Sequence, residues 1–123
     1  MVSYQPDTLH TVTPRIIVDD PDGLVRFLED TFQARALVRA GAPTEVHIGD
    51  SVVLVSDGAG QRERMCAFLY VYVADADASY RRALAAKAVS LEAPVDTPYG
   101  DRRAMVKDAW GNIWQIATLM RRR

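Results

Sequence analysis

The chain has 123 residues and a nearly balanced charge, with 15 Lys and Arg against 16 Asp and Glu and a net charge of -1 at pH 7. This length predicts one domain with a modest core, and the charge balance argues against nucleic-acid binding, which needs a strongly basic face. The single cysteine, Cys66, excludes an intrachain disulfide and favours a reducing cytoplasm.

Targeting and membrane signals are missing from the sequence. No apolar stretch approaches the roughly 20 residues that a membrane span requires, and residues 1–10 lack the apolar segment of a signal peptide. The basic run Arg121-Arg122-Arg123 is interpreted as a solvated tail. Cys66 stands at the start of an apolar run and is expected to be a small buried side chain. These features predict a soluble, cytoplasmic, globular protein with no membrane or nucleic-acid partner.

The first half of the chain gives a strand signal, a helix signal and then three strand signals. Asp20 and the following Pro21 suit a helix start, because an Asp side chain can cap free backbone N–H groups. Apolar positions then recur with a helical period, and Gly49-Asp50 is a two-residue hairpin signal. The expected elements are a strand at 13–19, a helix that starts at 20–23 and ends near 34, and strands at 36–38, 44–48 and 51–56.

The second half repeats this order after a polar segment, residues 57–64, which is interpreted as a linker. Its hairpin signal is Gly111-Asn112. The expected elements are a strand at 67–73, a helix at 76–88, a strand at 89–91, a Pro-bearing loop at 92–100, and strands at 103–107 and 113–118.

An internal repeat connects the two halves. An offset of 55 residues places Asp20 on Asp75, and it also matches Val18 with Val73, Asp22 with Asp77 and Arg26 with Arg81. An offset of 62 places Gly49-Asp50 on Gly111-Asn112. The sequence therefore predicts an α+β fold made of two βαβββ modules, at about 11–57 and 66–119, in a single domain.

Four stretches, in the right order and spacing, resemble the vicinal oxygen chelate superfamily of glyoxalases, bleomycin-resistance proteins and extradiol dioxygenases. The sequences YGDR at 99–102 and GDS at 49–51 look most like its PhnB-like branch, although Ala109 replaces the proline of the usual Asp-Pro-x-Gly motif. The four stretches are IIVDDPDGLVRFLEDTFQA, IGDSVVLVSD, YVYVADADASYRRALAAKA and YGDRRAMVKDAWGNIWQIAT.

The resemblance implies that the two sheets curl into an open cup with the helices outside, which holds a small molecule, and that the chain forms a homodimer. Many members bind a divalent metal in the cup through one side chain from the first and one from the last strand of each module. Carried over by position, these places are Thr13, Val53, Phe68 and Gln115. Two of these side chains have no lone pair and two are weak ligands, whereas a catalytic metal needs about three donors. His10 precedes the first place by three residues and would reach it only after a shift in register. We therefore expect no metal of the family type and no other cofactor.

The lining of the cup follows from strand alternation, which sends residues two apart to the same face. Glu45 and His47 are the candidate bases within it, because a carboxylate or an imidazole can accept a proton near neutral pH. The predicted ligand-binding residues are Thr13, Arg15, Glu45, His47, Val53, Phe68, Tyr70, Tyr72, Arg103, Met105 and Gln115.

Each of these positions also has a purely structural interpretation. The two tyrosines either stack against a ligand or fill the interior. The two arginines either bind a ligand carboxylate or phosphate, which suits their forked geometry, or pair with Glu45 or Asp101. His47 is either a base or a partly exposed polar position. Trp114 alternates away from Gln115 and is expected to face a helix or a partner subunit.

Three functions are compatible with this pattern. The first is a metal-independent binding protein that sequesters an antibiotic or another partly aromatic metabolite, as the resistance members of the family do. The second is a metal-independent lyase or isomerase that uses Glu45 or His47 as a base, with Arg103 to hold an oxyanion. The third is an assembly role for a collapsed cup.

Overall fold

The computed structural model describes residues 4–121, so Arg122 and Arg123 of the basic run, and Met1–Ser3, lie outside the described residues. The chain divides into two compact units at Met65 and Cys66, and Asp30–Phe32 group with the second unit. Each unit is described separately below. No helix among residues 4–121 is long and apolar enough to span a membrane.

The first unit contains a four-stranded mixed sheet. Its strand order is β1-β4-β3-β2, in which β1 pairs with β4 in parallel and the other pairs are antiparallel. The helix begins after Asp20, whose side chain accepts a hydrogen bond from the N–H of Gly23, as the sequence predicts. The elements are β1 (Arg15–Ile17), α1 (Pro21–Phe32), β2 (Arg35–Leu37), β3 (Thr44–Ile48) and β4 (Ser51–Ser56).

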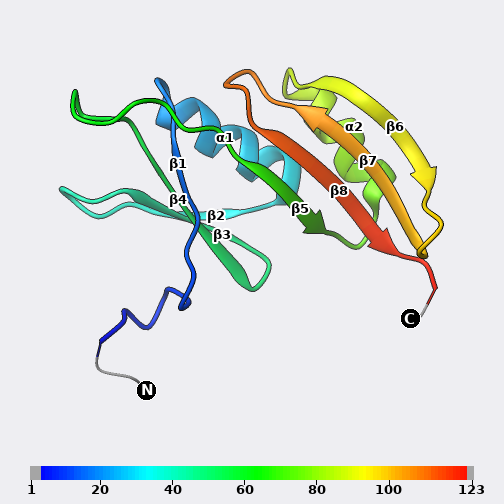
Figure 1. The fold of residues 1–123 in the computed structure, drawn as a ribbon, viewed down its shortest axis with the longest axis horizontal. Helices are drawn as coiled ribbons and strands as arrows, with labels where there is room; N and C mark the ends of the chain where they lie inside the picture. The colour runs from blue at the N-terminus through cyan, green and yellow to red at the C-terminus, as the bar shows by residue number, and fades with distance from the viewer. Residues whose placement is uncertain (1–3, 122–123) are drawn as a thin grey trace. The chain divides into compact units, whose positions relative to one another are not determined.

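The second unit has the same topology, with strand order β5-β8-β7-β6 and a parallel β5–β8 pair (Figure 1). Asp75 caps its helix just as Asp20 caps the first, so the predicted repeat extends to the caps. The elements are β5 (Phe68–Tyr72), α2 (Ala76–Ala85), β6 (Val89–Asp96), β7 (Asp101–Lys107) and β8 (Ile113–Leu119). The two mixed, open sheets and two helices confirm an α+β fold of βαβββ modules; the shared cup stays a prediction.

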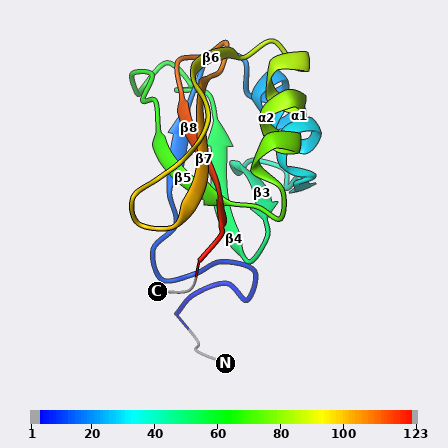
Figure 2. The ribbon, with the colours of Figure 1, turned by 90° about the vertical axis from the view of Figure 1, so that its right-hand side faces the viewer.

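One face of the second sheet packs against α2 (Figure 2). Trp114 and Ile116 are fully buried on this face, and the hydroxyl of Thr118 accepts a hydrogen bond from the N–H of Ala76 at the start of the helix. Trp114 also packs against Phe32, with 5.5 Å between ring centroids. Trp114 therefore faces a helix, as the alternation predicts.

The closing hairpin is held by a buried carboxylate. Asp108 accepts hydrogen bonds from the backbone N–H groups of Trp110 and Asn112, from the Asn112 side-chain amide, and from the indole N–H of Trp114. Asn112 in turn accepts a hydrogen bond from the N–H of Ala67, just before β5. This network gives the sequence DAWGNIW a structural role, since it joins the β7–β8 turn to β5 and to the core.

Two expectations are wrong. Residues 92–96, expected to be a loop, continue β6, because two register irregularities let a Pro-containing edge strand follow β7. Cys66, expected to be buried, is exposed, and its thiol donates to the carbonyl of Trp110. Cys66 starts the apolar run, but β5 begins two residues later, at Phe68.

Candidate functional site

The face of the second sheet that lies away from α2 carries a row of aromatic side chains. Phe68, Tyr70 and Tyr72 alternate along β5 and are 63%, 37% and 53% exposed. Tyr70 is the strand partner of Gln115, which in turn pairs with Met105, so these residues lie on one face. Arg103, two residues before Met105 on β7, lies on the same face, so these residues share one face as strand alternation predicts. That this face lines a cup and contacts a ligand stays a prediction.

A buried carboxylate fixes the orientation of the two tyrosines. The hydroxyls of Tyr70 and Tyr72 both donate to Oδ2 of Asp101, at 2.6 and 2.7 Å. Asp101 is 1% exposed, and its own N–H donates to the hydroxyl of Thr97. The two rings lie 5.3 Å apart and are tilted by 54°. Because both hydroxyls are bound at the inner end, the outer ring surfaces are held in place for contact with another molecule.

A second polar chain extends from these tyrosines to the edge of the sheet. The hydroxyl of Tyr70 contacts that of Tyr99 at 3.2 Å, and Nη1 of Arg103 donates to Tyr99 at 2.8 Å. Arg103 also binds Glu92 through Nε and Nη2 at 3.1 and 2.9 Å. The ion-pair interpretation of Arg103 is thus supported, with Glu92 as its partner in place of Glu45 or Asp101.

The pKa values in this network diverge. Burial and the hydrogen bond to Asp101 raise the pKa of Tyr70. The hydrogen bond with Tyr70 and the guanidinium of Arg103 lower the pKa of Tyr99. The hydrogen bond to Glu92 raises the pKa of Arg103. The site therefore contains one phenol that holds its proton tightly and an exposed phenol that releases it more readily.

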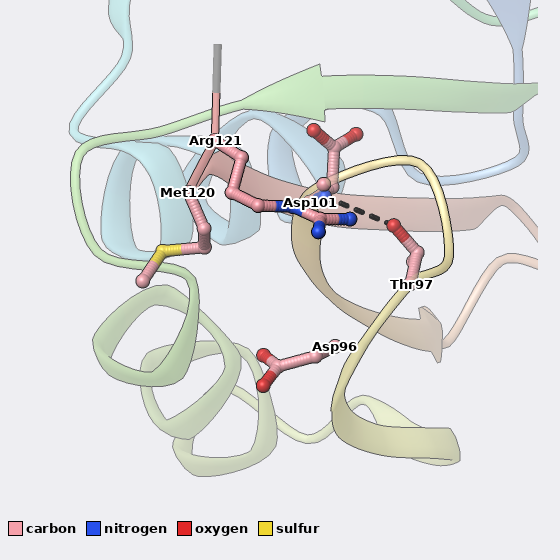
Figure 3. A pocket seen from close by; sticks show the side chains of 6 residues that line it. Asp96, Thr97, Asp101, Met120 and Arg121 are labelled. Atoms are coloured by element: carbon pink, nitrogen blue, oxygen red, sulfur yellow. Dashed lines mark hydrogen bonds between the residues drawn. The ribbon is translucent and has the colours of Figure 1, made fainter. Parts of the chain in front are cut away.

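A pocket of about 330 Å³ lies where β6 ends and β7 begins, beside the network. Asp96 and Asp101 both line it, but their carboxyl groups point in different directions, and the dashed line in Figure 3 marks the bond from Asp101 to Thr97. Arg121 lies over this end and donates to the carbonyl of Pro98. Of the predicted ligand-binding residues none lines this pocket, so the aromatic face remains the better candidate.

In the first unit, strand register separates Val53 from the other predicted residues. Val53 pairs with Val46, and both are buried, whereas Arg15 and Glu45 pair with Leu54 on the other face. Val53 was expected on the same face as Arg15 and Glu45, and this prediction is wrong by one residue. It aligned Gly49 with Gly111, and that alignment ignores the different lengths of the two hairpin turns. By strand pairing, Leu54 corresponds to Gln115.

Glu45 and His47 do lie on one face and in contact. Nε2 of His47 is 3.5 Å from Oε1 of Glu45, while Oε2 of Glu45 accepts a hydrogen bond of 3.0 Å from Arg39. The side chain of Glu45 is only 7% exposed. The hydroxyl of Thr8 and the guanidinium of Arg39 lower the pKa of Glu45 against the opposing effect of burial. Glu45 is thus a carboxylate at neutral pH and a weak base.

The remaining predicted residues of this unit make local contacts. The hydroxyl of Thr13 donates to the carbonyl of His10, and the imidazole of His10 contacts the carbonyl of Asp50 at 2.6 Å. Arg15 donates to the hydroxyl of Ser56. Within residues 4–121, no three His, Cys, Asp or Glu side chains gather as a metal site would require.

Sequence reasoning did not select Tyr99, Glu92 or Thr8, since all three lie in segments expected to be irregular. Asp101 was expected to pair with an arginine. Its hydrogen bonds to Tyr70 and Tyr72 were not expected, because the residue follows the irregular connection between β6 and β7. A signal did exist for Tyr99, because it opens the YGDR sequence that carries part of the resemblance.

The comparison with known proteins agrees with this geometry. The model of the Glyoxalase/Bleomycin resistance protein/Dioxygenase superfamily matches residues 8–116. The chain belongs to this superfamily. An uncharacterized protein of Mycobacterium bovis is 27% identical to it over 130 residues, which covers 89% of this chain and 84% of the relative.

Solved structures of similar proteins support the same assignment. TioX from Micromonospora sp. ML1 is 25% identical, with a TM-score of 0.76 and coverage of 90% of this chain and 99% of the other. A glyoxalase/bleomycin resistance protein/dioxygenase family enzyme from Burkholderia phytofirmans PsJN is 18% identical, with a TM-score of 0.75 and coverage of 88% and 97%. The likeness to the Burkholderia phytofirmans protein shows a shared fold alone.

Proposed function

We propose that this superfamily member binds a small, partly aromatic molecule on the open face of its second sheet and sequesters it without a metal. The row Phe68, Tyr70 and Tyr72 supports this most directly, because these three aromatic side chains are exposed on one face of the sheet. Aliphatic or polar side chains could have occupied the same positions. Flat aromatic ligands bind such surfaces by stacking and by burial of apolar area.

The polar neighbours of this row would give the ligand its orientation. Gln115 offers an amide beside Tyr70, and Met105 offers an adaptable apolar side chain next to it. Gln115 stands at a place where relatives carry a metal ligand, and an uncharged amide there suits a hydrogen bond to a ligand better than a divalent cation. An antibiotic is one candidate class of ligand, and a homodimer remains the expected assembly.

The test is a melting-temperature screen with polycyclic and heteroaromatic compounds, because a ligand that binds the folded state raises the melting temperature. We expect Phe68→Ala and Tyr72→Ala to weaken a hit at least about fivefold, as the loss of one aromatic contact costs about 1 kcal/mol. Tyr72→Phe keeps the ring but loses the hydrogen bond to Asp101, so it should weaken binding less than Tyr72→Ala does. Tyr4→Ala, which removes an exposed tyrosine of the first unit, is the matched control. Equal affinity in all four variants would show that the ligand binds elsewhere.

A second candidate function is a metal-independent lyase or isomerase, supported by the contact between Glu45 and His47. With the pKa of Glu45 lowered, His47 is the better base, and Glu45 would orient its imidazole. Turnover that survives a chelator and is lost in His47→Ala would support the enzyme. Turnover that is unchanged in His47→Ala would exclude this base.

A further inference from the structure

Two exposed tyrosine rings of β5, Tyr70 and Tyr72, form a pair on the open face of the second sheet. Their centroids are 5.3 Å apart and the ring planes are tilted by 54°. The face of a tyrosine ring is electron-rich, and it attracts a cation that lies within about 6 Å of the ring centroid. Because the two rings are so close, one cation at the outer side of the pair can lie within this range of both. The pair therefore offers a positive group more than a single exposed ring does.

A buried carboxylate lies behind the pair and strengthens this attraction. Both hydroxyls donate to Oδ2 of Asp101, which is 1% exposed. A hydroxyl that donates to an anion is polarised by it, so the electron density of the attached ring increases. The charge of a buried carboxylate is also screened less by water and salt than a charge on the surface. Both effects favour a cation at the outer side of the pair over a neutral group of the same shape.

The positive side chains on this face offer little opposition to such a cation. Arg103 reaches the hydroxyl of Tyr99 beside the pair, but its Nε and Nη2 donate to Glu92, whose charge offsets that of the guanidinium. Lys107 is exposed on the same face at the far end of β7, six residues after Asp101. At about 3.3–3.4 Å per residue, this separation is roughly 20 Å, which exceeds two Debye lengths of about 8 Å each.

We propose that the Tyr70–Tyr72 pair binds the positively charged group of the ligand, an ammonium or a ring-nitrogen cation attached to an aromatic system. This inference rests on the proposed function and narrows its ligand from aromatic molecules to cationic ones. The aromatic part lies along the row toward Phe68, four residues before Tyr72 and about 13 Å away along the strand. Aromatic side chains recognise quaternary ammonium groups in the same way in other proteins.

The test compares three probes that share one bicyclic ring. 1-Methylquinolinium is a permanent cation, quinoline is uncharged at neutral pH, and quinoline-4-carboxylate is an anion. NMR titration of the backbone amide signals gives a dissociation constant for each probe and shows whether it binds at β5. We expect 1-methylquinolinium to bind at least about fivefold more tightly than quinoline, because an exposed cation–π contact contributes about this factor. Quinoline-4-carboxylate should bind most weakly.

Three variants locate the origin of this preference, and urea unfolding verifies that each one folds. Asp101→Asn keeps the shape of the side chain and removes its charge, so the preference for the cation should fall to about twofold or less. Tyr72→Leu removes one ring and leaves the carboxylate, and it should weaken binding of the cation more than binding of quinoline. Asp96→Asn is the matched control, since its carboxyl group points in a different direction (Figure 3) and pairs with Arg102. It should keep the full preference.

The outcomes separate this inference from the proposed function. Binding of quinoline at β5 without a preference for 1-methylquinolinium would overturn the inference and leave the proposed function standing. Absence of saturable binding of all three probes at β5 would overturn both. A preference that survives in both Asp101→Asn and Tyr72→Leu, or that is lost equally in Asp96→Asn, would show that the cation binds elsewhere and would overturn the inference.

Discussion

Asp108→Asn should strongly destabilise the second unit. The carboxylate is buried and accepts five hydrogen bonds, of which those from the Asn112 amide at 2.9 Å and the Trp114 indole at 2.9 Å reach Oδ2. An asparagine retains one acceptor oxygen and turns an NH₂ group toward donors. At about 1.5–3 kcal/mol for each hydrogen bond to a charged group, the loss of two costs at least about 3 kcal/mol.

Urea unfolding followed by tryptophan fluorescence measures this effect. Both tryptophans, Trp110 and Trp114, lie in the second unit, so the signal reports on that unit. With a slope of about 2 kcal/mol per molar urea, the midpoint should fall by roughly 1.5 M. Asp96→Asn is the control, because its exposed pair with Arg102 contributes about 1 kcal/mol or less. A loss below about 1 kcal/mol in Asp108→Asn, or one equal to the control, would refute the reasoning.

Two further predictions concern pH. The pKa of Glu45 lies below its ordinary value of 4.5 when the protein is folded, so the stabilising effect of this carboxylate is complete above pH 4.5 and is lost as the pH falls through the folded pKa. The free energy of unfolding measured in urea should therefore drop more steeply below pH 4.5 in the wild type than in Glu45→Gln. Parallel curves for the two proteins would contradict this. The pKa of Tyr99 is lowered by Tyr70 and by Arg103. In an ultraviolet pH titration, Tyr99→Phe should therefore remove the earliest phenolate transition, and Arg103→Gln should move it to higher pH. An unchanged first transition in both variants would disprove the assignment.

The order of elements could be predicted from the sequence because local signals agreed with one another. Asp20 and Asp75 mark both helix starts by capping chemistry, which acts within one turn of the chain. Residues 44–48 and 51–56 have the predicted bounds, since alternation and the Gly49-Asp50 turn fix both the strands and their connection. The extension of β6 could not be predicted, because an edge strand with bulges has neither regular alternation nor a proline-free run.

The sequence could predict which site residues share a sheet face wherever strand alternation alone decides this. Tyr70, Gln115 and Met105 share a face because strand pairing has a period of two. Val53 was misplaced because the comparison of two hairpins must be correct to a single residue. The contacts of Asp101 and Thr8 join segments far apart in the sequence through irregular backbone, which no periodic pattern describes.

The irregular pairing of β6 has a consequence for the protein in concentrated solution. A net charge of -1 gives the molecules little mutual repulsion, so charge does little to keep the chains apart. β6 is the outer strand of its sheet, and its two shifts in register and Pro94 interrupt the row of backbone groups that another chain would need to extend the sheet. Removing the interruption, for example by Pro94→Val, would turn this edge into a template for polymerisation without touching the aromatic face.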